Sequence, residues 1–229
     1  MAGKRTYSDG CGVARALDTI GERWSLIIVR ELVFGPKRFT DLRAGMPGAS
    51  PNVLAQRLRE LEEAGVLRRR RLGPPSGAHV YELTERGRGL EPVLLELCRW
   101  DASSTLPARP VRSLDALMLW QRTAFDAEAA PGLSACFELR TDSDLFAVRV
   151  AFGRIEVRRG AARAPDATVE ADLETLICVL RRECALAEAV DRGRLKVTGD
   201  ADALDRFVRA LRAPAAAVRA PARSRPGPL

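Results

Sequence analysis

A stripe of polar side chains with hydrogen-bonding capacity recurs at helical spacing between residues 50 and 64. In the major groove of DNA, Asn52 and Gln56 could pair with adenine and Arg59 with guanine. Ser50 is a good N-cap and Pro51 suits the first helical position, so we expect a helix here. The stripe predicts a recognition helix. The alternative is the solvated polar face of an ordinary amphipathic helix.

The run of arginines Arg68–Arg71 is a second group of residues that could bind a nucleic acid. The run is followed by the Gly/Pro-rich segment 73–77 and by a short apolar segment at 79–83, which together predict a β-hairpin with a long loop. Half of the arginines in an alternating strand point to each face, so some face solvent in either register. They therefore predict contacts with phosphates or the minor groove. The alternative is a basic surface strand without function.

These two segments supply most of the predicted DNA contacts. His79, in the return strand of the hairpin, is interpreted as a structural or phosphate-adjacent residue and not as a catalytic one. The candidate contacts are Arg38, Ser50, Pro51, Asn52, Gln56, Arg57, Arg59, Arg69, Arg70, Arg71, Ser76 and His79.

The elements that position these residues follow a recognisable order. Apolar periodicity predicts helices over 11–20 and 23–34, a short helix at 39–43, a helix over 50–64, the hairpin, and a helix from Thr84 to about Trp100. Three helices, a turn, a helix, a hairpin and a helix make a winged helix-turn-helix domain.

The second half of the chain predicts a separate α+β unit. Its apolar and polar residues alternate as in half-buried antiparallel strands, at 135–140, 146–152, 154–159, 167–171 and 195–198. Helices are expected after Ser113 and over 173–182, 185–191 and 201–211. We therefore expect a DNA-binding and dimerisation domain over 1–103, a linker over 104–112, an antiparallel sheet covered by helices over 113–212, and a disordered tail over 213–229.

Composition bounds these expectations. The chain has 229 residues, which fits two modest domains, and a formal net charge of +7. That charge supports nucleic-acid binding only weakly, because a GC-rich genome also favours arginine codons. A run of about 18 uncharged apolar residues, as a membrane-spanning helix needs, is missing from the sequence, and we see no secretory signal, so a cytoplasmic protein is expected.

The sequence offers no constellation for catalysis. A nucleophile elbow, a phosphate-binding glycine loop and a metal-ligand helix are not found, and one histidine limits the options for a general base. The five cysteines have no spacing typical of a zinc site and are expected to be thiols. We expect neither an enzyme nor a bound metal or cofactor.

Several segments carry a family resemblance. The N-terminal half resembles the HxlR-type winged-helix regulators, which are related to the MarR group. The matching segments are CGVARALD (11–18), GERWSLII (21–28), GPKRFTDL (35–42), SPNVLAQRL (50–58) and YELT (81–84). The resemblance implies a homodimer joined through terminal helices, with a wing beside each recognition helix and an inverted-repeat operator of double-stranded DNA. Gly12 is a departure, because the family usually has proline there.

The resemblance also makes Cys11 a candidate thiol switch, because the early cysteine senses oxidants or electrophiles in some members of the family. The start of a helix favours a thiolate, which would support this role. The alternative is a small buried residue at the dimer interface.

The second half resembles the sterol carrier protein type 2 fold over about 113–211. The matching segments are FEL (137–139), RIEV (154–157), PDATVEAD (165–172) and GRLKVTGD (193–200). The resemblance implies an apolar ligand held between a sheet and its covering helices. Plausible lining residues are Phe146, Phe152, Leu176, Leu180, Leu195 and Phe207, and the alternative for each is simple core packing.

Together these features predict a homodimeric transcription regulator, a repressor by default, that responds to an apolar small-molecule effector. Two alternatives remain. One is a DNA-binding regulator with a switch at Cys11 and a second domain that only packs or dimerises. The other is a lipid or small-molecule carrier with a vestigial winged helix.

Overall fold

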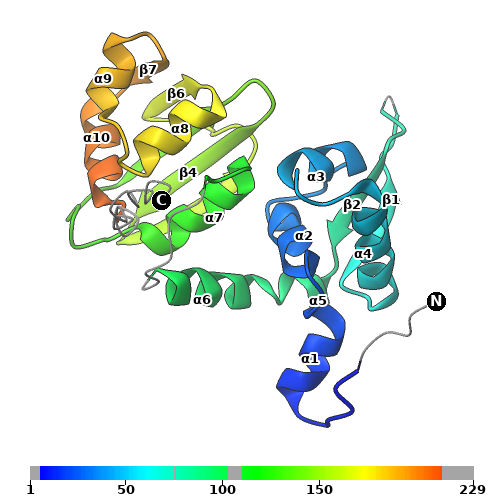
Figure 1. Ribbon diagram of the computed structural model, residues 1–229. Coiled ribbons are helices and arrows are strands. Elements are labelled where there is room, and N and C mark those ends of the chain that lie inside the picture. Colours follow the sequence, from blue (N-terminus) through cyan, green and yellow to red (C-terminus); the bar gives the residue numbers. More distant parts are fainter. Residues whose placement is uncertain (1–5, 75, 103–109, 213–229) are drawn as a thin grey trace, which may run out of the picture.

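The computed structural model describes residues 6–74, 76–102 and 110–212. Two units lie side by side, a winged-helix unit before residue 103 and a mixed-sheet unit after residue 109 (Figure 1). Most of the expected linker, 104–109, and the whole expected tail, 213–229, lie outside the described residues.

The winged-helix unit has the element order that the sequence predicts. Its elements are α1 (Gly12–Ile20), α2 (Ser25–Leu32), α3 (Phe39–Gly45), α4 (Pro51–Glu63), β1 (Leu67–Arg71), β2 (His79–Leu83), α5 (Glu85–Arg88) and α6 (Glu91–Asp101). Strands β1 and β2 pair antiparallel and form the wing. The core lies between α2 and α4, where Leu54, Leu58 and Leu61 are at most 1% exposed.

The expected single helix from Thr84 to Trp100 is divided into α5 and α6. Thr84 caps α5, since its hydroxyl accepts a hydrogen bond from the backbone N–H of Gly87 (3.2 Å). A Cβ at Gly87 would collide with the carbonyl oxygen of Val66, so the turn can pack against the wing strand only with glycine. Helix α6 then begins at Glu91, with a proline in its first turn.

The mixed-sheet unit contains α7 (Leu114–Ala124), β3 (Ala135–Arg140), β4 (Leu145–Ala151), β5 (Arg154–Arg159), β6 (Ala167–Ala171), α8 (Leu173–Leu180), α9 (Leu186–Asp191), β7 (Leu195–Gly199) and α10 (Ala201–Ala210). The strand order is β5-β4-β3-β6-β7. Strands β3 and β6 are parallel and the other pairs are antiparallel. The expectation of an antiparallel sheet was therefore wrong in one pairing, because the chain crosses from the β5 edge to the far side of β3.

The two units share a packed boundary along α7. Leu119 of α7 is 1% exposed and belongs to the core of the winged-helix unit, whereas Leu117 belongs to the core of the mixed-sheet unit. Phe34, just after α2, meets Phe146 of β4 edge to face at 5.5 Å. Helix α6 runs from the winged-helix unit toward the mixed-sheet unit in Figure 1. Helix α7 thus supplies side chains to both units.

Candidate nucleic-acid interface

Helix α4 presents the polar stripe that the sequence predicts. The Ser50 hydroxyl accepts a hydrogen bond from the backbone N–H of Val53 (3.3 Å), and Pro51 occupies the first turn. Because three leucines of α4 face the core, the opposite face is turned outward. Its exposed residues include Pro51, Asn52, Gln56 and Arg59. Local capping and helical periodicity together place these side chains on the surface.

Two members of the stripe bind each other. The Arg59 guanidinium donates to Gln56 Oε1 (2.7 Å), and the Gln56 amide donates to Glu60 Oε1 (2.7 Å). All three groups lie at the surface, where such bonds are readily exchanged for others. Gln56 must release these two bonds before it can make a bidentate pair with adenine, whereas Arg59 keeps further N–H donors for a base edge.

Arg57, another predicted contact, is placed away from the exposed stripe. Its guanidinium pairs with Glu60 and lies 3.6 Å from Glu22, and its side chain is only 19% exposed. These contacts tie α4 to the turn that follows α1. In this arrangement Arg57 positions the helix and does not extend the exposed stripe.

The arginine run on β1 is divided by a carboxylate that the sequence analysis did not single out. Glu82 on β2 accepts from Arg68 (2.7 Å) and from Arg70 (3.0 Å). Burial by itself would raise the pKa of Glu82, but the hydrogen bonds and charges of the two arginines lower it overall. Glu82, a residue of the hairpin itself, therefore relieves the repulsion between the arginines of the run. The alternation of β1 could have indicated which arginines share a face, but not their acidic partner.

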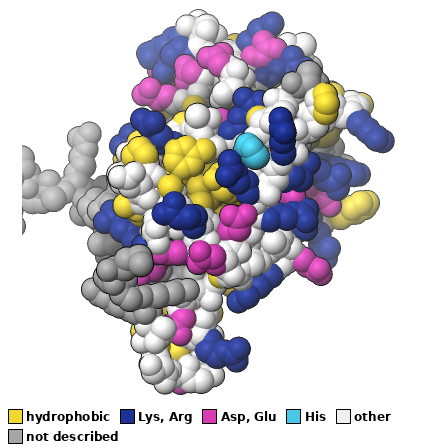
Figure 2. Space-filling model, turned by 90° about the vertical axis from the view of Figure 1, so that its right-hand side faces the viewer, with side chains coloured by type: hydrophobic (Ala, Val, Ile, Leu, Met, Phe, Trp, Pro, Cys, Tyr) yellow, Lys and Arg dark blue, Asp and Glu magenta, His cyan; other side chains and the backbone are white. Residues whose placement is uncertain are grey.

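The other two arginines of the run, Arg69 and Arg71, point to the opposite side of the strand. Arg71 donates to the carbonyl of Gly77 in the wing tip (3.1 Å), and Arg69 makes no ion pair with any residue that the structure describes. His79 is exposed and stands opposite Arg71 in the register. Figure 2 shows many Lys and Arg side chains on the face that carries the wing, with acidic side chains among them.

The wing tip is joined to the start of α3 by two of the predicted contacts. The Arg38 guanidinium donates to the Ser76 hydroxyl (3.0 Å). The neighbouring Lys37 makes two backbone hydrogen bonds with Tyr81 of β2 (3.0 and 2.8 Å). These contacts hold the wing in a defined position beside the helix-turn-helix elements.

Cys11 is exposed and lies at the N-cap of α1. The backbone N–H groups of Val13 and Ala14, at the start of α1, lower the pKa of its thiol. The arrangement favours the thiolate, as the start of a helix is expected to do.

Most of the residues predicted to line an apolar ligand site lie in the core of the mixed-sheet unit. Five of the six candidates, Phe146, Leu176, Leu180, Leu195 and Phe207, are at most 3% exposed and pack in the core of the mixed-sheet unit. Phe207 stacks on Phe137 with ring centres 5.0 Å apart. The burial of these side chains agrees with the alternative of simple core packing.

Phe152 was wrongly assigned to this site, because it is 96% exposed. Phe152 and Gly153 form the two-residue connection between β4 and β5, and both have positive φ (52° and 69°). Such turns match the twist of a hairpin and direct their side chains outward. The alternation of the strand ends one residue earlier than expected.

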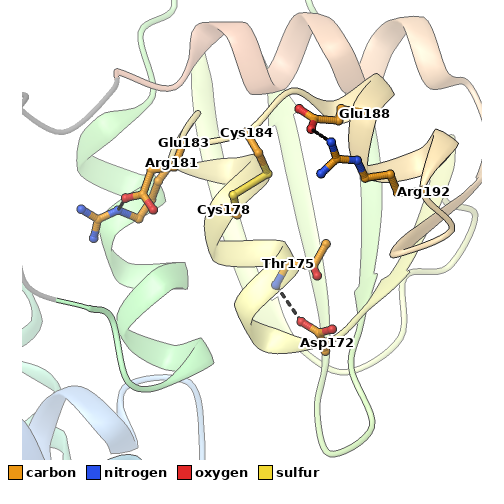
Figure 3. The surroundings of a disulfide bond; sticks show 8 residues. All are labelled: Asp172, Thr175, Cys178, Arg181, Glu183, Cys184, Glu188 and Arg192. Carbon is orange, nitrogen blue, oxygen red and sulfur yellow. Dashed lines mark hydrogen bonds and ion pairs between the residues drawn. A yellow bond between two sulfur atoms is a disulfide. The ribbon is translucent and has the colours of Figure 1, made fainter.

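The cysteines of the mixed-sheet unit also differ from expectation. Cys178 and Cys184 form a disulfide between the end of α8 and the turn before α9, with their Cα atoms 5.4 Å apart (Figure 3). They were expected to be thiols. Proximity through the turn after α8 brings them together, which their separation of six residues alone did not indicate.

A buried ion cluster joins the two units. The Lys37 ammonium donates to Glu31 (2.9 Å) and also binds Asp115 of α7, which in turn binds Arg159 of β5. The Ser113 hydroxyl donates to Glu31 (2.6 Å). Burial by itself would raise the pKa of Glu31, but the nearby cations and these hydrogen bonds lower it overall. The members of this cluster are far apart in the chain, so no local pattern in the sequence indicates it.

None of the helices among the described residues has the length and apolar character of a membrane-spanning segment. The described residues also bring together no group of three or more His, Cys, Asp or Glu side chains that could hold a metal ion.

Comparison with known proteins agrees with the two units. The HxlR-like helix-turn-helix family matches residues 19–108, and the SCP-2 sterol transfer family matches residues 121–212. The uncharacterized HTH-type transcriptional regulator YvaP of Bacillus subtilis is 37% identical over 86 residues, which are 38% of this chain and 80% of YvaP. YdeP of the same organism is 40% identical over 92 residues, or 40% of this chain and 72% of YdeP.

Solved structures also match the winged-helix unit. The redox regulator HypR in its oxidized form is 36% identical with a TM-score of 0.39, over 41% of this chain and 97% of HypR. Quinone-bound YodB from B. subtilis is 33% identical with a TM-score of 0.36, over 40% of this chain and 97% of YodB.

Proposed function

The chain belongs to the HxlR-like helix-turn-helix family, a family of transcription regulators, and from this premise we propose that it binds double-stranded operator DNA as a homodimer. The operator is an inverted repeat, and the protein represses by occupying it. The proposal includes no catalytic activity. It implies a cytoplasmic protein, since the DNA that it binds lies there.

The observation that carries this proposal is the pairing of an exposed polar stripe with a basic wing. The exposed side chains of α4 include Asn52, Gln56 and Arg59, and the wing adds Arg69 and Arg71 on one face. Residues of a recognition helix read base edges, while exposed arginines neutralise phosphates. The contacts that Arg38 and Lys37 make with the wing tie it to the start of α3.

Exposed apolar side chains on two helices support the dimer. Val13 and Leu17 of α1 are 68% and 39% exposed, and they lie one helical turn apart. On α6, Val93, Leu97 and Trp100 are also exposed at helical spacing. A second copy that covered these faces would remove them from water, which favours association.

The proposal is tested by titrating the full chain with a promoter fragment that contains an inverted repeat and with random duplex, at two salt concentrations. We expect a clear preference for the operator and a steep fall in affinity with salt, because each phosphate contact releases a counterion. Equal affinity for random duplex would contradict the regulator and favour the carrier with a vestigial winged helix. Sedimentation at the same protein concentrations tests the dimer.

A thiol switch at Cys11 is the second candidate function, and it is favoured by the exposure of this side chain and the lowered pKa of its thiol. We expect Cys11 to react with iodoacetamide faster than Cys98, because burial raises the pKa of the Cys98 thiol. Alkylation of Cys11 should change operator affinity, and a Cys11→Ser variant should not respond. The close packing of the sheet unit supports the alternative in which that unit packs or dimerises and holds no apolar effector.

A further inference from the structure

A hollow between the two units has a lining that differs from the rest of this basic chain. Its volume is about 600 Å³, and it is bounded by α3 on one side and by α7, the β3–β4 turn and the start of α8 on the other. Six carboxylates and three cations line it, although the chain has a formal net charge of +7. Cavities of this size hold small organic molecules.

Two of the three cations are already committed to carboxylates. Lys37 lies between Glu31 and Asp115, and Arg159 lies between Asp115 and Asp144. The third cation, Arg112, is exposed. The ion cluster therefore leaves no surplus of positive charge inside the cavity.

Three further carboxylates of the lining lack a cationic partner among the described residues. Asp41 accepts from the backbone N–H of Arg38 (3.0 Å), and Asp172 caps α8 by accepting from the N–H of Thr175 (2.7 Å). Asp142 makes no hydrogen bond or ion pair with any described residue. A carboxylate offers about four acceptor positions, so Asp41 and Asp172 keep some free. The start of α8 is already occupied by Asp172 and is not open to an anion.

We propose that this cavity binds an organic cation, a small molecule with a protonated amine or guanidine on a compact apolar body. The cationic group would meet the carboxylates that lack a cation, in charge-assisted hydrogen bonds. The apolar body would lie against Pro36, Leu114 and Leu173, which also line the cavity. An anion would meet the surplus of carboxylates, so the cavity is no part of the DNA-binding surface.

The cavity lies next to the contacts that position the wing. Lys37, in its wall, is bonded through its backbone to Tyr81 of the wing, and α3 begins two residues later. Asp41, Ala44 and Gly45 of α3 also line the cavity. A ligand seated here touches groups that hold α3, the wing and α7 together. This coupling rests on the proposed function: the cation changes operator affinity, and the operator changes cation affinity by the same factor.

The test is calorimetric titration of the full chain with a panel of aryl and alkyl primary amines, guanidines and quaternary ammonium ions, each beside its neutral and carboxylate isosteres. We expect at least one cation to bind about tenfold or more tightly than its isosteres, which is the size of a charged hydrogen bond. Binding by no cation, or equal binding by the neutral isosteres, overturns the proposal.

Variants locate the site. Ala44→Trp fills the cavity and should abolish binding, whereas Thr40→Trp, on the same helix but outside the lining, should leave binding unchanged. Asp142→Asn should weaken binding by about two- to fivefold, as loss of an exposed ion pair does. Undiminished binding by the Ala44→Trp variant would place the cation elsewhere and overturn the proposal.

The two proposals fail separately. Operator binding without any selectivity for cations would contradict the proposed cavity site and would not affect the proposed function as a regulator. Conversely, the chain could bind a cation, lose that binding in the Ala44→Trp variant and show no preference for any operator. This result would support the cavity site and contradict the proposed function as a regulator. If both binding events occur, operator titrations with and without the bound cation measure the coupling, and an unchanged operator affinity overturns the coupling.

Discussion

The wing and the boundary between the units contain the same motif of charges in opposite surroundings. In each, one carboxylate binds two cations: Glu82 binds Arg68 and Arg70, and Asp115 binds Lys37 and Arg159. Arg68 and Arg70 are 64% and 45% exposed, whereas Lys37 is 9% and Asp115 is 1% exposed.

Burial decides what each motif can do. Exposed ion pairs contribute about 0 to 1 kcal/mol and are screened by salt, so the wing can exchange its carboxylate for a phosphate. Removing one partner of a buried pair leaves uncompensated charge, which costs about 3–5 kcal/mol. The ion pairs of the wing can thus be exchanged for contacts with phosphates, whereas the buried ion pairs hold the two units together.

The largest expected effect comes from breaking the buried motif. Asp115→Ala should lower the free energy of unfolding by about 3 kcal/mol, because Lys37 and Arg159 lose a shared partner in a poorly solvated place. Glu82→Ala is the matched control and should cost less than about 1 kcal/mol. Urea unfolding of both variants measures the difference, and equal losses would contradict the comparison.

The next effect concerns the stripe on α4. Replacing Gln56 and Arg59 by alanine should lower discrimination between the operator and single-base variants by about 1–3 kcal/mol, since a bidentate base contact is worth that much. Competition titrations with mutated operators measure it. Unchanged discrimination would mean that the two side chains only bind each other.

The exposed side of the wing should govern salt dependence. Replacing Arg69 and Arg71 by alanine should weaken binding to all duplexes alike and reduce the salt slope by about two. Arg68→Ala should change the slope less, because Arg68 is already paired with Glu82. If Arg68→Ala has the same effect per arginine, the pairing does not persist in the complex.

The smallest effect should come from freeing the paired arginines. Glu82→Gln removes the negative charge between Arg68 and Arg70, so affinity for random duplex should rise by about two- to fivefold, the worth of an exposed pair. Anisotropy titrations at low salt detect such a change. A fall in affinity would show that Glu82 orders the wing for DNA.

Local signals in the sequence were sufficient for much of the fold. Ser50 and Pro51 start α4 as predicted, because a cap depends on residues within one helical turn. The parallel pairing of β3 with β6 was missed, since strands far apart in the chain form it.

The candidate site was predictable only in part, for the same physical reason. Helical periodicity indicated which residues of α4 are exposed. Pairing of Arg70 with Glu82 depends on the hairpin register, and burial of Lys37 depends on α7, whose Asp115 lies 78 residues further along the chain. Phe152 was misplaced because apolar alternation does not show where a tight turn begins.

The position of α7 has a consequence for how such a protein can be recombined. Since Leu119 completes the core of the winged-helix unit, a cut in the chain before α7 would leave a hole in that core. A chimera that exchanges the second unit between relatives should therefore keep α7 with its own helix-turn-helix and join the foreign segment after Ala124. The seam between the modules lies inside the second unit, not in the connecting segment.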